Sequence, residues 1–379
     1  MYKLACILFI LPFLTGNTGS EKTSRMYMNT TFRPGQAKSI RKVLINFQDS
    51  IPDDTLSLYF SDANIPIVFS RDIHTAVCLD TVCRLVNITL YWEITGKYLG
   101  YSLPDGEELT KKEHFPFILS DYNRLHEILA DSSSQLGFYT PEEMHPVKTA
   151  VTKTDGITGA TPPDISAWIV PAAAYTSYSL WHLTYGATRD SIIAFTKKNL
   201  LNNNLLTSQL ESNDPYSQLM ALRWITETNQ ECKQYTEPAV KILNNGNFTT
   251  SVHALKFLRK CEPDKTKLQQ KVVYLLDSED FRIKNMAIGY LRESDSIAQP
   301  VAKELLTRLK SDNYYLVNVI LGLFEKRYQP DFQDQKFLCE MLNSKNVNIA
   351  NRIYYFLLNI TDPSPELVKQ LKRYKKKEL

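Results

Sequence analysis

The chain has 379 residues, of which 44 are lysine or arginine and 41 are aspartate or glutamate, so its formal charge is only +3. This near balance argues against a dedicated nucleic-acid-binding protein. A content of 43% hydrophobic and 22% charged residues is typical of globular chains, and the length predicts two or three domains. The sequence lacks the motifs of dinucleotide-binding folds, P-loops, serine hydrolases and zinc peptidases, which excludes their readily recognised members.

Residues 1–20 have the pattern of a secretory signal peptide. Lys3 precedes an apolar run over residues 4–14, and a small and polar stretch follows it. The apolar run is shorter than the roughly 20 residues that a permanent transmembrane helix needs. We therefore expect residues 1–20 to be cleaved, and the remaining protein to be exported to the periplasm or another extracytoplasmic compartment without a membrane span.

The spacing of apolar residues in 21–195 is typical of an α+β domain. Apolar Val86, Ile88, Leu90 and Trp92 alternate with more polar neighbours, which predicts a strand with one buried face. Gly96 would then turn the chain into a hairpin. The pattern predicts strands at 43–47, 65–69, 86–92 and 97–103, and a helix after Ser120.

Two cysteines, Cys78 and Cys83, lie just ahead of the long strand with four residues between them. In an oxidising compartment this spacing suits a disulfide that closes a turn. The alternative is a redox-active dithiol, although the spacing is wider than in the usual exchange motif. After signal cleavage Cys232, Cys261 and Cys339 also remain, so the number of cysteines is odd.

The segment Asp155-Gly156-Ile157-Thr158-Gly159-Ala160-Thr161 carries the functional prediction. It resembles the pattern Asp-x-x-[Ser/Thr]-Gly-Ala-[Thr/Ser] of FMN-binding domains in exported and membrane electron-transfer proteins. The resemblance implies that a flavin transferase moves FMN from FAD onto Thr161 and leaves a phosphoester. Asp155, Thr158, Gly159 and Ala160 complete the motif, and the two small residues leave the backbone open to close approach.

Two further segments, 110–117 and 174–182, are similar to segments of exported bacterial proteins that carry this flavin motif. Pro162 and Pro163 stand where the family commonly has another hydroxyl residue, and the alternative interpretation is an ordinary turn that caps a helix. The stretch 161–186 is rich in aromatic residues. These rings would shield a flavin, but a helix packed in the core explains the same residues and is the default interpretation.

A turn pattern recurs through residues 196–379 with a period of 33. Its leucine occurs at Leu210, Leu243, Leu276, Leu309 and Leu342. Small or aliphatic residues follow in the same register at Ala221, Ala254, Ala287, Ile320 and Ile353. Each repeat contains two helices by its apolar spacing, and the first is expected to begin after Asp214, Asn247, Asp280, Asn313 or Asn346.

This array of helical hairpins resembles HEAT repeats, which stack in succession and bind partners over long surfaces. The register places Cys339 in a buried column, as an inert thiol. It also places Cys232 and Cys261 at the same edge of adjacent repeats, where a disulfide is sterically possible.

Together these patterns predict an exported α+β FMN-binding-like domain followed by an all-α HEAT-like region. The protein would be an electron carrier rather than a substrate-converting enzyme, with the repeats docking a redox partner protein. Two alternatives remain: a non-catalytic interaction scaffold, and a dithiol oxidoreductase that uses Cys78 and Cys83.

Overall fold

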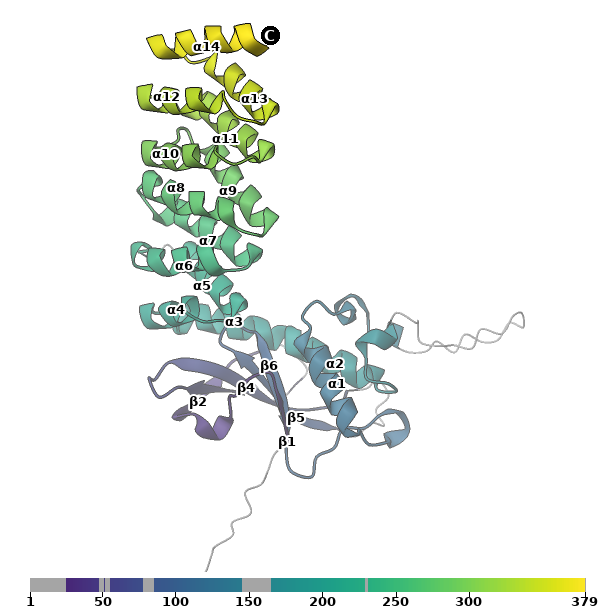
Figure 1. The fold of residues 1–379 in the computed structure, drawn as a ribbon. Helices are drawn as coiled ribbons and strands as arrows, with labels where there is room; N and C mark the ends of the chain where they lie inside the picture. Colours follow the sequence, from purple (N-terminus) through teal and green to yellow (C-terminus); the bar gives the residue numbers. More distant parts are fainter. Residues whose placement is uncertain are drawn as a thin grey trace, which may run out of the picture. The chain divides into compact units, whose positions relative to one another are not determined.

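The computed structural model in Figure 1 describes residues 25–47, 51, 55–77, 85–144, 165–228 and 231–378. The chain divides into two compact units, Met1–Leu200 and Leu201–Leu379. Helix α3 (Ala187–Asn199) lies at the end of the first unit, so the expected domain boundary between residues 195 and 196 falls inside a helix. The predicted signal peptide lies outside the described residues.

A six-stranded antiparallel sheet forms the centre of the first unit. Its strand order is β1-β6-β5-β4-β3-β2, so the strand nearest the N-terminus pairs with β6. The strands are β1 (Arg25–Met28), β2 (Ser39–Leu44), β3 (Thr55–Phe60), β4 (Pro66–Thr75), β5 (Val86–Glu93) and β6 (Tyr98–Leu103). The expected hairpin is β5 with β6. The prediction of a strand at 43–47 was wrong in its extent, because β2 ends at Leu44.

One face of the sheet packs against α1 (Leu119–Ala130), α2 (Ala174–Tyr185) and α3. The Trp92 side chain is fully buried there, and its indole N–H donates a hydrogen bond to the carbonyl of Thr184 at 2.9 Å. The Thr196 hydroxyl donates to the carbonyl of Ile94 at 2.8 Å. These bonds attach α2 and α3 to the strand that the alternating pattern predicted.

The opposite face of the sheet is covered at one end. Phe32 packs edge-on against Tyr59, with ring centroids 5.4 Å apart, and also contacts Tyr91. The alternating pattern predicted that Tyr91 faces solvent, but its side chain is 5% exposed. Burial raises the pKa of Tyr91 to about 12, although a hydrogen bond with Ser102 opposes the shift. The prediction was wrong here because residues 29–38 cover this part of the sheet.

Helix α1 begins one residue before the expected cap, Ser120. The backbone N–H of Ile118 donates to the carboxylate of Asp121 at 2.9 Å, and Lys111 forms an ion pair with the same carboxylate at 2.7 Å. Burial of Asp121 opposes its ionisation, but the hydrogen bonds from Lys111 and Ile118 outweigh it and lower the pKa. The start of α1 is therefore set by an acidic side chain inside the helix.

The second unit is built from paired helices in two layers (Figure 1). The first helices of the pairs pack in succession, α5 on α7, α7 on α9, α9 on α11 and α11 on α13. They are α5 (Pro215–Glu227), α7 (Phe248–Cys261), α9 (Phe281–Glu293), α11 (Tyr314–Arg327) and α13 (Val347–Leu357). The other layer contains α4 (Asn203–Leu210), α6 (Thr236–Asn245), α8 (Lys265–Val273), α10 (Gln299–Arg308), α12 (Phe332–Met341) and α14 (Pro365–Glu378).

The predicted period of 33 residues is present in the caps of the first helices. Each of these helices begins one residue after the expected aspartate or asparagine, whose side chain accepts a hydrogen bond from the first turn. The column Ala221, Ala254, Ala287, Ile320 and Ile353 is fully buried at every repeat. The cap positions and the core positions were therefore both predictable from the same register.

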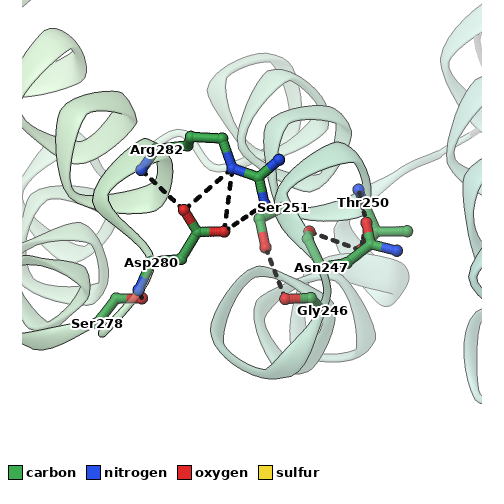
Figure 2. A network of polar contacts seen from close by, with 7 residues as sticks. All are labelled: Gly246, Asn247, Thr250, Ser251, Ser278, Asp280 and Arg282. Carbon is green, nitrogen blue, oxygen red and sulfur yellow. Dashed lines mark hydrogen bonds and ion pairs between the residues drawn. The ribbon is translucent and has the colours of Figure 1, made fainter.

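Figure 2 shows two successive turns of this series. The Asn247 side chain accepts from the backbone N–H of Thr250 at 3.0 Å. In the next repeat Asp280 accepts from the N–H of Arg282 at 2.8 Å and also binds its guanidinium group at 2.7 Å. The guanidinium lies 5.1 Å from the centroid of the Phe248 ring, so it links the two repeats. Hydrogen bonding by Arg282 lowers the pKa of Asp280.

Two buried glutamines, Gln269 and Gln335, connect successive repeats in the same manner. The side chain of Gln269 donates to the carbonyl of Ser296 at 2.7 Å and accepts from the N–H of Ala298 at 2.8 Å. Sixty-six residues later, two periods of 33, Gln335 makes the equivalent bonds with Asp362 and Ser364, at 2.9 and 2.8 Å. Each side-chain amide thus donates a hydrogen bond to one backbone carbonyl, and accepts one from a backbone N–H, in a loop of the following repeat.

The cysteines of the second unit lie where the 33-residue register predicts. Cys232 and Cys261 form a disulfide with a Cα–Cα distance of 5.6 Å, so the pairing allowed by the sequence is present. Cys339 is a buried free thiol, and burial raises its pKa to about 11. The prediction of a buried thiol at this position is confirmed.

Candidate functional site

The residues predicted to carry the chemistry fall in two segments outside the described residues. The flavin motif, Asp155 to Thr161, lies within 145–164, and the cysteine pair Cys78 and Cys83 lies within 78–84. The structure does describe the residues at which these segments join the fold. Those residues, and the side chains around them, define the candidate site.

Both segments join the fold beside helix α2. The described chain stops at Met144, in a short helix (Glu142–Met144) that packs on α2, and it resumes at Ile165. Met144 is 2% exposed and Ile165 is fully buried. The cysteine segment begins after Val77, which is also buried and whose carbonyl accepts a hydrogen bond from the Ser179 hydroxyl of α2 at 3.0 Å.

The chain after Ile165 is attached to α1 and α2. Arg124 of α1 donates from its guanidinium group to the carbonyl of Ala167. The backbone N–H of Val170 donates to the hydroxyl of Ser177 at 2.9 Å, and this buried hydroxyl donates in turn to the carbonyl of Ala173 at 3.0 Å. The short helix Ile165–Trp168 is thereby tied to α1, and the residues after it are tied to the first turn of α2.

The aromatic residues of α2 connect it to the end of α1 and to the short helix Gln135–Phe138. The Trp181 indole donates to the carbonyl of Asp131 at 2.9 Å, and the Tyr185 hydroxyl donates to the carbonyl of Leu129 at 2.7 Å. Trp181 is 8% exposed. Packing in the core, rather than contact with a cofactor, therefore accounts for Trp181.

Tyr178 and His182, on the same helix, are only half-buried. Their ring centroids lie 4.2 Å apart, and His182 Nε2 lies 3.1 Å from the carbonyl of Leu136. Burial lowers the pKa of His182, although its hydrogen bond to that carbonyl opposes the shift. A neutral imidazole and a phenol ring next to each other form an aromatic surface on α2, the helix that both chemical segments adjoin.

Segment 110–117, the first of the two that resembled flavin-carrying proteins, contacts the loop just before the second, 174–182. The N–H of Lys112 donates to the carbonyl of Ala172 at 2.7 Å. Both His114 and Ala172 have φ near 60°, in the left-handed region that residues other than glycine rarely occupy. Such backbone strain is common at functional sites. Sequence reasoning did not identify these two residues, because neither histidine nor alanine signals a left-handed conformation.

The remaining described histidines give no evidence of a catalytic or metal centre. His126 lies between the Tyr98 hydroxyl, 3.1 Å from Nδ1, and the Asn29 side-chain oxygen, 2.7 Å from Nε2. Burial lowers its pKa. In the part of the chain that the structure describes, no group of three or more histidine, cysteine, aspartate or glutamate residues is arranged to hold a metal ion.

The second unit contains a hollow of about 490 Å³ between the first two turns of the repeat series. Its lining includes Glu211, Asn213, Lys241 and Asn245, and the described residues around it include no aromatic side chain. This surface does not provide rings for stacking against a flavin. Among the described residues, every helix is too short or too polar to cross a bilayer.

Comparison with known proteins adds no assignment. No family model matches the chain, and no curated protein is similar to it.

Proposed function

We propose that the protein is an extracytoplasmic electron-transfer flavoprotein that carries FMN covalently on Thr161. The observation that carries the proposal is the motif Asp155-Gly156-Ile157-Thr158-Gly159-Ala160-Thr161. The proposal includes a HEAT-like role for the second unit, in which the stacked helices dock a redox partner protein. The covalent bond would keep a soluble cofactor from being lost outside the cytoplasm.

The described residues near the two ends of the segment that holds the motif include chemical groups that would suit FMN. Thr161 would hold the phosphate, and Gly159 and Ala160 would give the transferase access to its hydroxyl. Near Ile165, Arg124 supplies a cationic group, although it already forms an ion pair with Glu127 at 3.0 Å that a phosphodiester would have to share. On α2, the half-buried rings of Tyr178 and His182 suit stacking against an aromatic system. When bound, FMN supplies the capacity to accept and release electrons.

Attachment would be a group transfer from FAD. The threonine oxygen forms a bond to the phosphorus of the FMN portion, the phosphoanhydride bond breaks, and AMP leaves. The hydroxyl proton is released at the same time, so the protein gains the mass of one FMN less one water.

The test is co-expression of the full chain with a flavin transferase, followed by intact-mass measurement and an absorption spectrum. We expect a yellow protein with the added mass, and a colourless Thr161→Ala variant without it. Thr152→Ala, which removes a hydroxyl outside the motif, is the matched control and should remain yellow.

An unmodified wild-type chain would overturn the proposal and leave the interaction scaffold as the interpretation. In that case alkylation of Cys78 and Cys83 before and after mild reduction tests the dithiol alternative. A pair that changes state readily would favour an oxidoreductase, whereas a resistant pair would be structural.

A further inference from the structure

The last helix of the repeat series, α14, carries a cluster of exposed cations. Its inner face packs against the preceding pair: Leu367 is fully buried, and the Tyr374 ring stacks on Tyr354 with centroids 5.1 Å apart. The Tyr374 hydroxyl also donates to the Asn351 side chain at 2.9 Å. Helix α14 is therefore docked on the preceding pair with a defined orientation.

Between residues 368 and 376, the exposed charged side chains of α14 are all positive. Five exposed cations follow one another there, Lys369, Lys372, Arg373, Lys375 and Lys376. None of them forms an ion pair with a carboxylate of the described residues, whereas basic residues earlier in the unit do so repeatedly, as Lys303 does with Asp331 and Arg352 with Glu325. Several cations within the stack are thus paired, whereas the five on α14 form no ion pair among the described residues.

Exposed apolar side chains occur on α14 itself and at the end of the helix that precedes it. Val368 of α14 is 39% exposed, and Leu358 and Tyr355, at the end of the preceding helix, are 51% and 55% exposed. Tyr355 is connected to α14 through Tyr354, whose ring lies 5.5 Å from that of Tyr355. A basic helix with apolar side chains at its margin has the composition of a surface that binds to anionic membranes.

We propose that the exposed face of α14 binds anionic phospholipid headgroups and holds the protein at a membrane surface. The cations suit lipid better than a protein partner, because four of the five are lysines, which protein–protein interfaces generally exclude in favour of arginine. A second copy of the chain is disfavoured as occupant, because two such faces would repel each other. The proposal is independent of the flavin.

The test is co-sedimentation of the purified full-length protein with vesicles of pure phosphatidylcholine and with vesicles containing 30% phosphatidylglycerol, in about 0.1 M NaCl. We expect binding to the anionic vesicles only, and release as the salt concentration is raised. The variant K369Q/K372Q/R373Q/K376Q should bind at least tenfold more weakly, since each cation contributes roughly a factor of five.

A matched control variant, K233Q/K256Q/K267Q/K336Q, removes four exposed lysines that are scattered over the same unit and lowers the net charge equally. It should retain most of the vesicle binding. Circular dichroism should show that both variants are folded. The proposal is overturned if the α14 variant binds as well as the wild type, if both variants lose binding equally, or if neutral vesicles bind as strongly. Absence of vesicle binding together with retention on polyglutamate would overturn it in favour of an acidic protein partner.

Discussion

The two units differ in how their contacts relate to the sequence. In the second unit, equivalent residues 33 positions apart perform the same task, as Asn247, Asp280 and Asn313 do when they cap successive helices. In the first unit each contact occurs once, and it often joins distant residues, as in the pairing of Arg25 with Leu103. In the second unit, a substitution can therefore be compared with the same substitution at the equivalent position of another repeat. The first unit offers no equivalent position.

The largest effect that separates the units is expected from Trp92→Ala. Loss of this fully buried side chain should destabilise the first unit by about 3–5 kcal/mol, and the Thr184 carbonyl would lose its partner. Hydrogen exchange should show lost protection in the sheet and little change in α7 to α13. Trp224→Ala, at a site of similar burial in the second unit, should show the reverse. Equal effects of either variant on both units would mean that the units unfold together.

Removal of the Cys232–Cys261 disulfide should cause the second-largest loss of stability. The bond closes a loop of 29 residues, so the double variant C232S/C261S should lose about 3–4 kcal/mol of unfolding free energy. Urea denaturation of the second unit measures this loss. Reductant should lower the stability of the wild type by a similar amount and leave that of the double variant unchanged. A wild type insensitive to reductant would contradict the expectation.

The two glutamine bridges test how closely the repeats are equivalent. Gln269→Ala and Gln335→Ala each remove one donor and one acceptor bonded to the next repeat, so each should cost about 1–2 kcal/mol. Gln333→Ala, at an exposed site on α12, should change the unfolding free energy by less than about 0.5 kcal/mol. A large difference between the two buried sites would show that the repeats are not energetically equivalent.

The smallest expected effect is a pH dependence in the first unit. Burial lowers the pKa of both His126 and His182, so these side chains bind protons more weakly in the folded than in the unfolded state. Stability should therefore fall as the pH decreases below about 6.5, where the unfolded chain takes up protons. Unfolding free energies at pH 7.5, 6.5 and 5.5 measure the slope. His126→Gln should reduce it, and a slope of opposite sign would contradict this account.

The sequence predicted the second unit in more detail than the first because periodicity supplies five observations of each position. The caps and the buried column follow directly from the register. In the first unit β3 was not recognised, although Thr55, Ser57 and Tyr59 alternate with apolar residues in its sequence, and five of its six residues are buried. Strand β1 has only four residues and owes its place to the pairing with β6, which a local pattern cannot indicate.

For the candidate site, the motif comes from the sequence, and the structure describes only the residues that flank the motif in the chain. Thr161 stays a prediction, because it lies outside the described residues. Two features had no sequence signal: the strained backbone at His114 and Ala172, and the contacts of α2 with described residues that flank the two chemical segments. Both arise from tertiary contacts between segments that are about 60 or more residues apart in the chain.

The buried Cys339 thiol has a consequence for assembly of the protein in an oxidising environment. Burial raises the pKa of this thiol to about 11, so the thiolate is scarce at neutral pH. Disulfide exchange needs the thiolate and access to it, and burial withholds both. The unpaired cysteine can therefore persist beside the Cys232–Cys261 bond without scrambling it or cross-linking one molecule to another.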